Sequence, residues 1–234
     1  MPPSCIWTAG FNAFHQLSDH EGDVCEFERF QPDHQDINVL CSSWSSTAVK
    51  TGKQIRSLGF QEFTADSPAA LASPIGDGVN GLLGFVDSQG SVHLLSDSPE
   101  QETPGTTFNP SGGPEAPRIS TLAIAGNGKV AITFKQAPNG QLTHVAEFIS
   151  FETFVKWHKD PSEADNYPAA HHMLPGRPKQ LLANGGNFIL LMEGGEVYTW
   201  GDPRFRTLAR PTAGSDSTPA DKPGLVEALG GLKI

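Results

Sequence analysis

The sequence predicts an all-β fold made of repeated hairpins, and three observations indicate it. The 234-residue chain contains 25 Gly and 19 Pro, a composition that suits many tight turns between short strands and does not suit long helices. Apolar and β-branched runs recur along it, separated by Gly-containing turns. The two ends of the chain also match each other. A chain of this length can bury a substantial core without disulfide support.

The match between the ends extends over twelve residues. The N-terminal stretch 6–17 reads aliphatic, aromatic, Thr, any residue, Gly, three residues, Phe, two residues, Leu, and the stretch 197–208 repeats this pattern. The offset is constant, because Gly10 corresponds to Gly201 and Phe14 to Phe205, 191 residues further on. The pattern therefore predicts the same local structure at both ends.

Four hairpins are predicted in order along the chain. Each has an apolar strand, a tight turn and a second apolar strand, which is a strong short-range hairpin signal. They comprise residues 46–49 with 55–60, 82–86 with 92–95, 130–134 with 142–148, and 188–192 with 197–200. The repeats recur on average about every 48 residues, within the range of propeller blades. We therefore expect residues 1–234 to form a single β-propeller domain with about four repeat units visible.

A short inner strand and a bend are predicted before the hairpins. Residues 122–128 resemble residues 181–187, and residues 39–44 hold the equivalent place in the first repeat. Gly10, Gly59 and Gly201 stand at strand ends, where we expect a turn that a Cβ atom would hinder. The aromatic side chains of Trp7, Tyr198 and Trp200 are expected to pack between blades.

Three polar segments rich in Pro, Gly, Ser and Thr are expected to be flexible insertions. They lie near 96–117, 160–178 and 212–223. Helical periodicity is weak, and residues 148–157 and 225–229 are the only short candidates.

Charge and composition exclude several classes of protein. The formal net charge of −10 argues against direct, broad binding of nucleic acid or anionic membranes, but leaves room for a basic protein partner. No apolar run approaches the length of a membrane span, and the N-terminus lacks the pattern of a signal peptide. Three cysteines cannot all pair. These features predict an intracellular protein of the nucleus or cytoplasm with reduced thiols.

No motif predicts an active site. Cys25, His34 and Cys41 are 9 and 7 residues apart, which lacks the close ligand pairs typical of zinc sites. Residues 126–129 lack the full frame of a phosphate-binding loop, and no Gly-x-Ser-x-Gly element occurs. We therefore expect no metal, no cofactor and no enzymatic activity, so that a hydrolase is the least favoured class.

The repeat motif resembles a known family. Residues 194–201 with Phe205 and Leu208, the closing stretch 223–234 and the N-terminal stretch 7–17 are similar to the repeat of the regulator-of-chromosome-condensation (RCC) family. Residues 43–48 resemble the opening of small RCC-domain-containing proteins. The resemblance covers residues 5–60 and 177–234 well and is faint between them. The complete family propeller has seven blades, and residue 234 falls where a further inner strand would begin, so we expect a partial propeller.

The resemblance implies a protein-interaction scaffold that presents one face to a partner, as in chromatin-associated and tubulin-linked members of the family. The alternative it implies is a guanine-nucleotide exchange factor for a small Ran-like GTPase. The expected partner is a chromatin protein or a small GTPase. Trp44 could lie in the core or at the mouth of the channel, and the other candidates lie in loops after strands, which propellers use for binding. The candidate contact residues are Phe11, Asn12, His15, Trp44, Asp202, Arg204 and Arg206.

Overall fold

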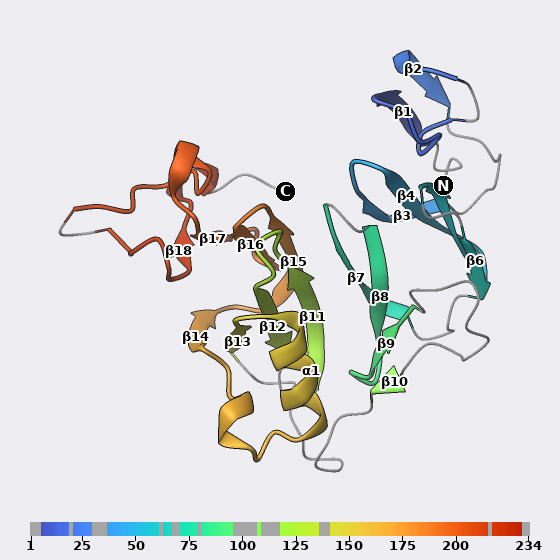
Figure 1. The fold of residues 1–234 in the computed structure, drawn as a ribbon. Helices are drawn as coiled ribbons and strands as arrows, with labels where there is room; N and C mark the ends of the chain where they lie inside the picture. Colours follow the sequence, from blue (N-terminus) through green and yellow to red (C-terminus); the bar gives the residue numbers. More distant parts are fainter. Residues whose placement is uncertain are drawn as a thin grey trace.

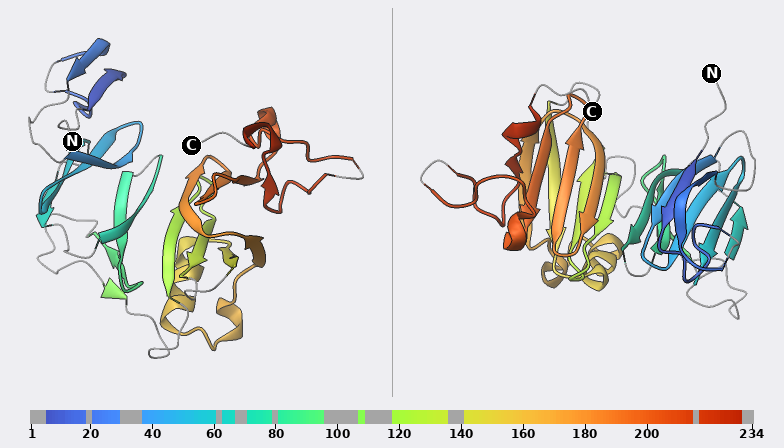
Figure 2. Two further views of the ribbon diagram at one scale, coloured as in Figure 1. Left: turned by 180° about the vertical axis from the view of Figure 1, so that it is seen from behind. Right: turned by 90° about the horizontal axis from the view of Figure 1, so that it is seen from above.

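The chain folds into small antiparallel sheets that stand side by side in chain order (Figures 1 and 2). The computed structural model describes residues 6–18, 21–29, 37–60, 63–66, 71–78, 81–95, 107–108, 118–135, 141–214 and 217–230. Among these residues it has four four-stranded sheets and one two-stranded sheet. This architecture confirms the all-β prediction and the prediction of about four repeat units.

Each four-stranded sheet is a meander in which consecutive strands pair. The two-stranded sheet holds β1 (Trp7–Gly10) and β2 (Val24–Arg29). The first two blades are β3 (Ile37–Ser42), β4 (Ser46–Thr51), β5 (Gln54–Gly59) and β6 (Phe63–Asp66), then β7 (Leu71–Asp77), β8 (Gly81–Asp87), β9 (Val92–Leu94) and β10 (Thr107–Phe108). The last two are β11 (Ile119–Ile124), β12 (Val130–Phe134), β13 (Leu142–Phe148) and β14 (Ala170–Pro175), then β15 (Pro178–Asn184), β16 (Asn187–Met192), β17 (Val197–Gly201) and β18 (Gly224–Leu225).

The first strand of each blade contacts the first strand of the next: β3 contacts β7, β7 contacts β11, and β11 contacts β15. This is the arrangement of propeller blades around a common axis. The predicted hairpins are the second and third strands of each blade, in register. The turn predicted at 138–140 lies outside the described residues.

The core lies between successive sheets. One apolar cluster fills each gap between neighbours, so the middle strands of the first three blades are covered on both faces. β12 is buried along its whole length for this reason. In the gap between the third and fourth blades, Trp200 is only 1% exposed and packs against Phe188 at a ring-centroid distance of 5.2 Å. Tyr198 is also buried. The prediction that these two aromatic residues of β17 pack between blades is confirmed.

Three 3-10 turns, Ala164–Asn166 (η1), Arg204–Arg206 (η2) and Glu227–Leu229 (η3), and one α-helix complete the described structure. The helix α1 (Phe151–Lys159) begins at Ser150, whose hydroxyl oxygen accepts a hydrogen bond from Thr153 N at 3.1 Å. Its buried Phe154 packs against Phe148 of β13. The short helix predicted at 148–157 is thus present and closes one end of the third blade.

The segment 160–178 differs from its prediction. It contains η1 and the outer strand β14, which pairs with β13 over six residues. Its Pro-rich sequence predicts a flexible insertion, but pairing with β13 satisfies the backbone of residues 170–175 and makes them part of the blade. The segment 96–117 lies mostly outside the described residues, except for β10. The described part of 212–223 has no strand or helix, and the Arg210 guanidinium donates hydrogen bonds to the carbonyls of Thr218, Pro219 and Lys222.

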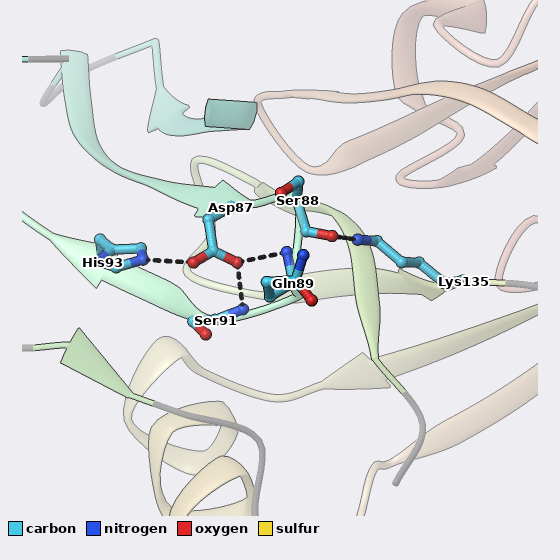
Figure 3. A network of polar contacts seen from close by, with 6 residues as sticks. All are labelled: Asp87, Ser88, Gln89, Ser91, His93 and Lys135. Atoms are coloured by element: carbon cyan, nitrogen blue, oxygen red, sulfur yellow. Dashed lines mark hydrogen bonds and ion pairs between the residues drawn. The ribbon is translucent and has the colours of Figure 1, made fainter. Parts of the chain in front are cut away.

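A polar network secures the β8–β9 turn and joins it to the next blade (Figure 3). Asp87 accepts hydrogen bonds from the N–H groups of Gln89 at 2.8 Å and Ser91 at 2.9 Å, and its other oxygen lies 3.0 Å from His93 Nε2. Burial opposes ionisation of Asp87, but these hydrogen bonds outweigh it and hold its pKa below the usual value. Lys135, at the end of β12, donates to Ser88 O. The turn predicted between residues 82–86 and 92–95 is confirmed, and Lys135 connects it to the third blade.

Candidate protein-interaction site

An exposed cluster of four aromatic side chains lies where the two-stranded sheet meets the first blade. We call Phe11, Phe14, Trp44 and Phe60 the aromatic patch. Phe14 is its centre, because its ring makes edge-to-face contacts with the other three. The ring-centroid distances are 6.2 Å to Phe11, 5.1 Å to Trp44 and 5.9 Å to Phe60. The other three side chains are 52%, 56% and 73% exposed, respectively. A contiguous exposed apolar surface of this kind marks an interaction site more often than scattered apolar residues do.

Three loops supply the aromatic patch. Phe11 and Phe14 follow β1, Trp44 lies between β3 and β4, and Phe60 follows β5. All three loops belong to the same face, because the chain leaves β1, β3 and β5 at that end of the sheets. In propellers such loops carry binding surfaces because the strands hold them in place.

Gln16 connects two of these loops through hydrogen bonds. Its side chain is 3% exposed, and its Nε2 donates to Phe11 O at 2.9 Å and to Trp44 O at 3.0 Å. Its Oε1 accepts from Phe14 N at 3.0 Å. Phe60 N donates to Ser45 O at 2.9 Å, and Trp44 N donates to Gly78 O at 3.2 Å in the second blade. The aromatic patch is therefore held by hydrogen bonds from three sheets, which lowers the entropy that a partner must remove on binding.

Of the candidate residues near the N-terminus, the structure brings Phe11 and Trp44 into the aromatic patch. His15 is exposed in the same loop with a positive φ of 57°. Asn12 differs from these residues, because it is fully buried and its side chain serves the loop itself. Its side-chain Nδ2 donates to Ser18 O at 3.2 Å and Gly22 O at 3.2 Å, while its Oδ1 accepts from Leu17 N at 2.8 Å. A polar residue in a turn can serve the turn itself, and sequence does not separate that role from binding.

The three candidates near the C-terminus lie in the loop after β17, at the other end of the row of sheets (Figure 1). Arg204 and Asp202 pair with each other: Arg204 Nε donates to Asp202 Oδ2 at 2.7 Å, and this hydrogen bond holds the pKa of Asp202 below its usual value. Arg206 is exposed. The structure therefore separates the seven candidates into two groups instead of forming one site.

Two residues of the aromatic patch were missed as contacts. Phe14 belongs to the repeat motif, and its equivalent Phe205 is 93% exposed, so the internal repeat could have indicated a surface position. Phe60 ends a predicted strand, and its ring contact with Phe14 depends on tertiary structure. Trp7 also differs from its prediction, because it is 59% exposed instead of packed between blades.

The internal repeat is confirmed in atomic detail. Thr8 Oγ1 donates to Leu17 O at 3.3 Å, and the equivalent Thr199 Oγ1 donates to Leu208 O at 2.6 Å. Gly10 and Gly201 both have a φ of 122°. The strand β1 therefore corresponds to β17, the third strand of the last blade.

A separate pair of histidines lies on β13 and β14. His144 Nε2 is 2.8 Å from His171 Nδ1, and their rings stack. Burial lowers the pKa of His144, and the nearby His171 and His172 lower it further. On the other face of the sheet, His172 Nε2 is 2.7 Å from Glu147 Oε1.

The His144 pair predicts a loss of stability on mild acidification. A lowered pKa in the folded state means that the unfolded chain takes up the proton first, as pH falls through about 6.5. We expect the free energy of unfolding to fall between pH 7.5 and 5.5, and His144→Gln to reduce this fall by less than about 1 kcal/mol, because solvent screens the site. Urea unfolding of the parent chain and of the variant at both pH values measures this fall in the free energy of unfolding. An unchanged pH dependence in the variant would show that other groups cause the fall.

Within the described residues, no group of three or more His, Cys, Asp or Glu side chains is arranged to hold a metal ion. The described helices include none that is long and apolar enough to cross a membrane. Cys25 is exposed and Cys41 is half-buried, and neither forms a disulfide bond with another described residue.

Blade order, meander topology and the cores between sheets define a β-propeller. No protein-family model matches the sequence, and no curated protein does either. Among solved structures, human WBSCR16 is similar with a TM-score of 0.52 and 12% identity, over 94% of this chain and 60% of that one. Prp20p from Saccharomyces cerevisiae is similar with a TM-score of 0.52 and 12% identity, over 96% of this chain and 59% of that one.

The chain thus spans about 60% of the length of these two solved chains. At this level of identity the likeness shows the fold alone. The chain is a β-propeller at the level of the fold.

Proposed function

We propose that this chain is a non-enzymatic protein-interaction scaffold of RCC-repeat type, and that the aromatic patch is where a partner protein docks. The observation that carries the proposal is the exposure of Phe11 and Trp44 on loops that Gln16 holds in place, next to the exposed Phe60. Tryptophan and other aromatic side chains are enriched at the energetic centres of protein interfaces. Leaving such side chains in water has a cost that burial against a partner removes.

The chemistry around the aromatic patch favours a partner with basic side chains. The strand β2, which pairs with β1, carries exposed Glu26 and Glu28, and Glu21 and Asp23 precede it on the surface. Arginine and lysine side chains pack on aromatic faces through cation–π contacts and pair with carboxylates. The net charge of −10 adds long-range attraction for such a partner. A nuclear or cytoplasmic location, as expected for a chromatin-linked adaptor, belongs to the same proposal.

Photo-crosslinking in cells tests the proposal. A photoreactive phenylalanine analogue is placed at Trp44 or Phe60, and at Phe205 as a matched control that is more exposed but lies in the loop after β17. We expect one and the same protein to be crosslinked from positions 44 and 60 and not from 205. Equal crosslinking from all three positions, or none from 44 and 60, would contradict the docking role of the aromatic patch.

Loss of one patch residue should weaken that complex without unfolding the chain. For Trp44→Ala we expect a loss of about 2 kcal/mol in binding, roughly 30-fold in Kd, since this side chain is 56% exposed and contributes little to the core. Phe205→Ala serves as the control and should bind like the parent chain. Binding is measured by calorimetry with the crosslinked partner, and circular dichroism verifies the fold. A Trp44→Ala variant that binds normally would exclude Trp44 as an anchor.

The second candidate function is guanine-nucleotide exchange on a small Ran-like GTPase. It is supported by the likeness to Prp20p, whose structure was described together with its binding to Gsp1p and histones. Release of labelled GDP from Gsp1p distinguishes the two functions. A scaffold leaves the release rate unchanged, whereas an exchange factor increases it by orders of magnitude at catalytic concentrations.

A further inference from the structure

Three side chains with metal-binding atoms share one face of the outer edge of the third blade. In the antiparallel pair of β13 and β14, His144 lies directly opposite Met173, and His171 is two residues before Met173 on the same strand. Residues two apart on a strand point to the same face, and so do directly opposed residues of an antiparallel pair. Strand pairing therefore brings two imidazoles and one thioether to a single surface.

The two imidazoles already converge. His144 Nε2 lies 2.8 Å from His171 Nδ1. A hydrogen bond between two ring nitrogens needs a proton on one nitrogen and a lone pair on the other, so at least one ring is neutral and can act as a ligand. Two imidazole nitrogens that bind one ion at about 2.0–2.1 Å in a tetrahedral site lie roughly 3.3–3.4 Å apart. An ion can therefore replace the shared proton if the pair opens by about 0.5 Å.

Exposure and packing suit these side chains to bind an ion from solution. His171 is exposed, Met173 is 57% exposed and His144 is half-buried, so an ion can reach all three. The ring of the buried Phe134 lies against the ring of His144 at a centroid distance of 4.9 Å, which restricts the rotation of His144. The strands β13 and β14 pair over six residues and hold the donors in place without the ion.

The chemistry of the donors selects the ion. Thioether sulfur is a soft ligand that favours Cu(I), and imidazole also binds copper. Hard cations such as Ca²⁺ and Mg²⁺ need oxygen ligands. The single carboxylate on β13 and β14 belongs to Glu147, which lies on the other face of the sheet with its Oε1 2.7 Å from His172 Nε2. The face that carries Met173 therefore suits a soft ion and lacks the oxygen donors that a hard ion requires.

We propose that His144, His171 and Met173 form a binding site for a cuprous ion, with two imidazole nitrogens and one thioether sulfur as its ligands. The site is open to solvent on one side, so the ion can exchange with other donors. It lies in the third blade and does not depend on the aromatic patch or on its proposed function. The proposal departs from the expectation of no metal, which rested on the spacing of Cys and His along the sequence. His144 and Met173 are 29 positions apart and meet only through strand pairing.

Competition for Cu(I) tests the proposal on the full chain without an affinity tag. Serine replaces its three cysteines, because thiolates also bind Cu(I). Cu(I), kept reduced by ascorbate in the absence of oxygen, is divided between the chain and the chromogenic chelator bicinchoninate. We expect roughly 10–100-fold weaker binding for His144→Gln, His171→Gln and Met173→Leu, since even a change beside a ligand has an effect of this size. His15→Gln removes an exposed imidazole from the loop after β1 and should bind like the parent.

The methionine methyl groups give an independent readout on the chain with its cysteines intact. Of the three methionines, Met173 is exposed and Met192 is fully buried. With ¹³C-labelled methyl groups, Cu(I) added beyond the amount that the cysteines bind should shift the NMR signal of Met173 and leave that of Met192 unchanged. If the chain without cysteines does not fold, this measurement decides.

Two results would overturn the proposal. One is a Met173 signal that does not move with Cu(I), or a Met173→Leu variant that binds Cu(I) like the parent, because the thioether would then be no ligand. The other is Zn(II) bound more tightly than Cu(I), with an affinity that falls in His144→Gln and is unchanged in Met173→Leu. That result would assign the two histidines to a zinc site in place of the cuprous site.

Discussion

Replacing Gly201 by alanine should destabilise the chain by about 2–6 kcal/mol. The residue has a φ of 122°, which L side chains rarely adopt, and such strain costs about 1–3 kcal/mol. A Cβ atom there would also collide with Gly186 O and lie 2.9 Å from Asn187 Cα, at the bend that joins β15 to β16. Overpacking of this kind adds about 1–3 kcal/mol. Urea unfolding followed by tryptophan fluorescence measures the loss, since the buried Trp200 is the adjacent residue.

Gly10→Ala is the matched control for that prediction. Gly10 has the same φ of 122°, but the nearest atom to an added Cβ is Leu17 Cδ1 at 4.0 Å. Only the backbone strain should therefore remain, about 1–3 kcal/mol. Equal losses in the two variants would show that the collision at Gly201 relaxes and that φ alone sets the cost.

The second large effect is expected for Asn12→Ala, about 3 kcal/mol. Its buried amide donates to Ser18 O and Gly22 O and accepts from Leu17 N and Ser18 N at 2.8 and 3.2 Å. Removing the amide leaves several backbone groups without a partner inside the loop, and each unsatisfied buried group costs about 1–3 kcal/mol. The measurements are urea unfolding and hydrogen exchange at the amides of Leu17 and Ser18.

His15→Ala, in the same loop but exposed, should change the free energy of unfolding by less than about 0.5 kcal/mol. Because Gln16 lies in this loop and holds Trp44, Asn12→Ala should also weaken partner binding at the aromatic patch. Normal stability of Asn12→Ala would mean that water satisfies the freed groups. Normal stability with lost binding would instead return Asn12 to the role of a direct contact.

The sequence by itself determined the repeating unit. Glycine turns such as the one at Gly195 and the apolar runs beside it specified the second and third strands of each blade, because hairpin pairing is local. The match of Gly10 with Gly201 also predicted equal backbone conformations, since a turn with positive φ requires the same residue wherever it recurs. The outer strands were not predicted: β14 lies in a Pro-rich stretch, and β18 has only two residues. Such outer strands form because of the strand they pair with, and their own residue pattern does not specify them.

Only the tertiary structure decided which residues form the candidate site. Phe14 and Phe60 lie 46 positions apart in the sequence, and the packing of two sheets brings their rings to 5.9 Å. Asn12 is buried by the residues of its own loop, and Trp7 is exposed. Local sequence cannot distinguish these outcomes, because a polar turn residue and an aromatic strand residue can each serve the fold or face solvent. Exposure is set by what lies beside a residue, and for Phe14 and Phe60 that neighbour comes from a distant part of the chain.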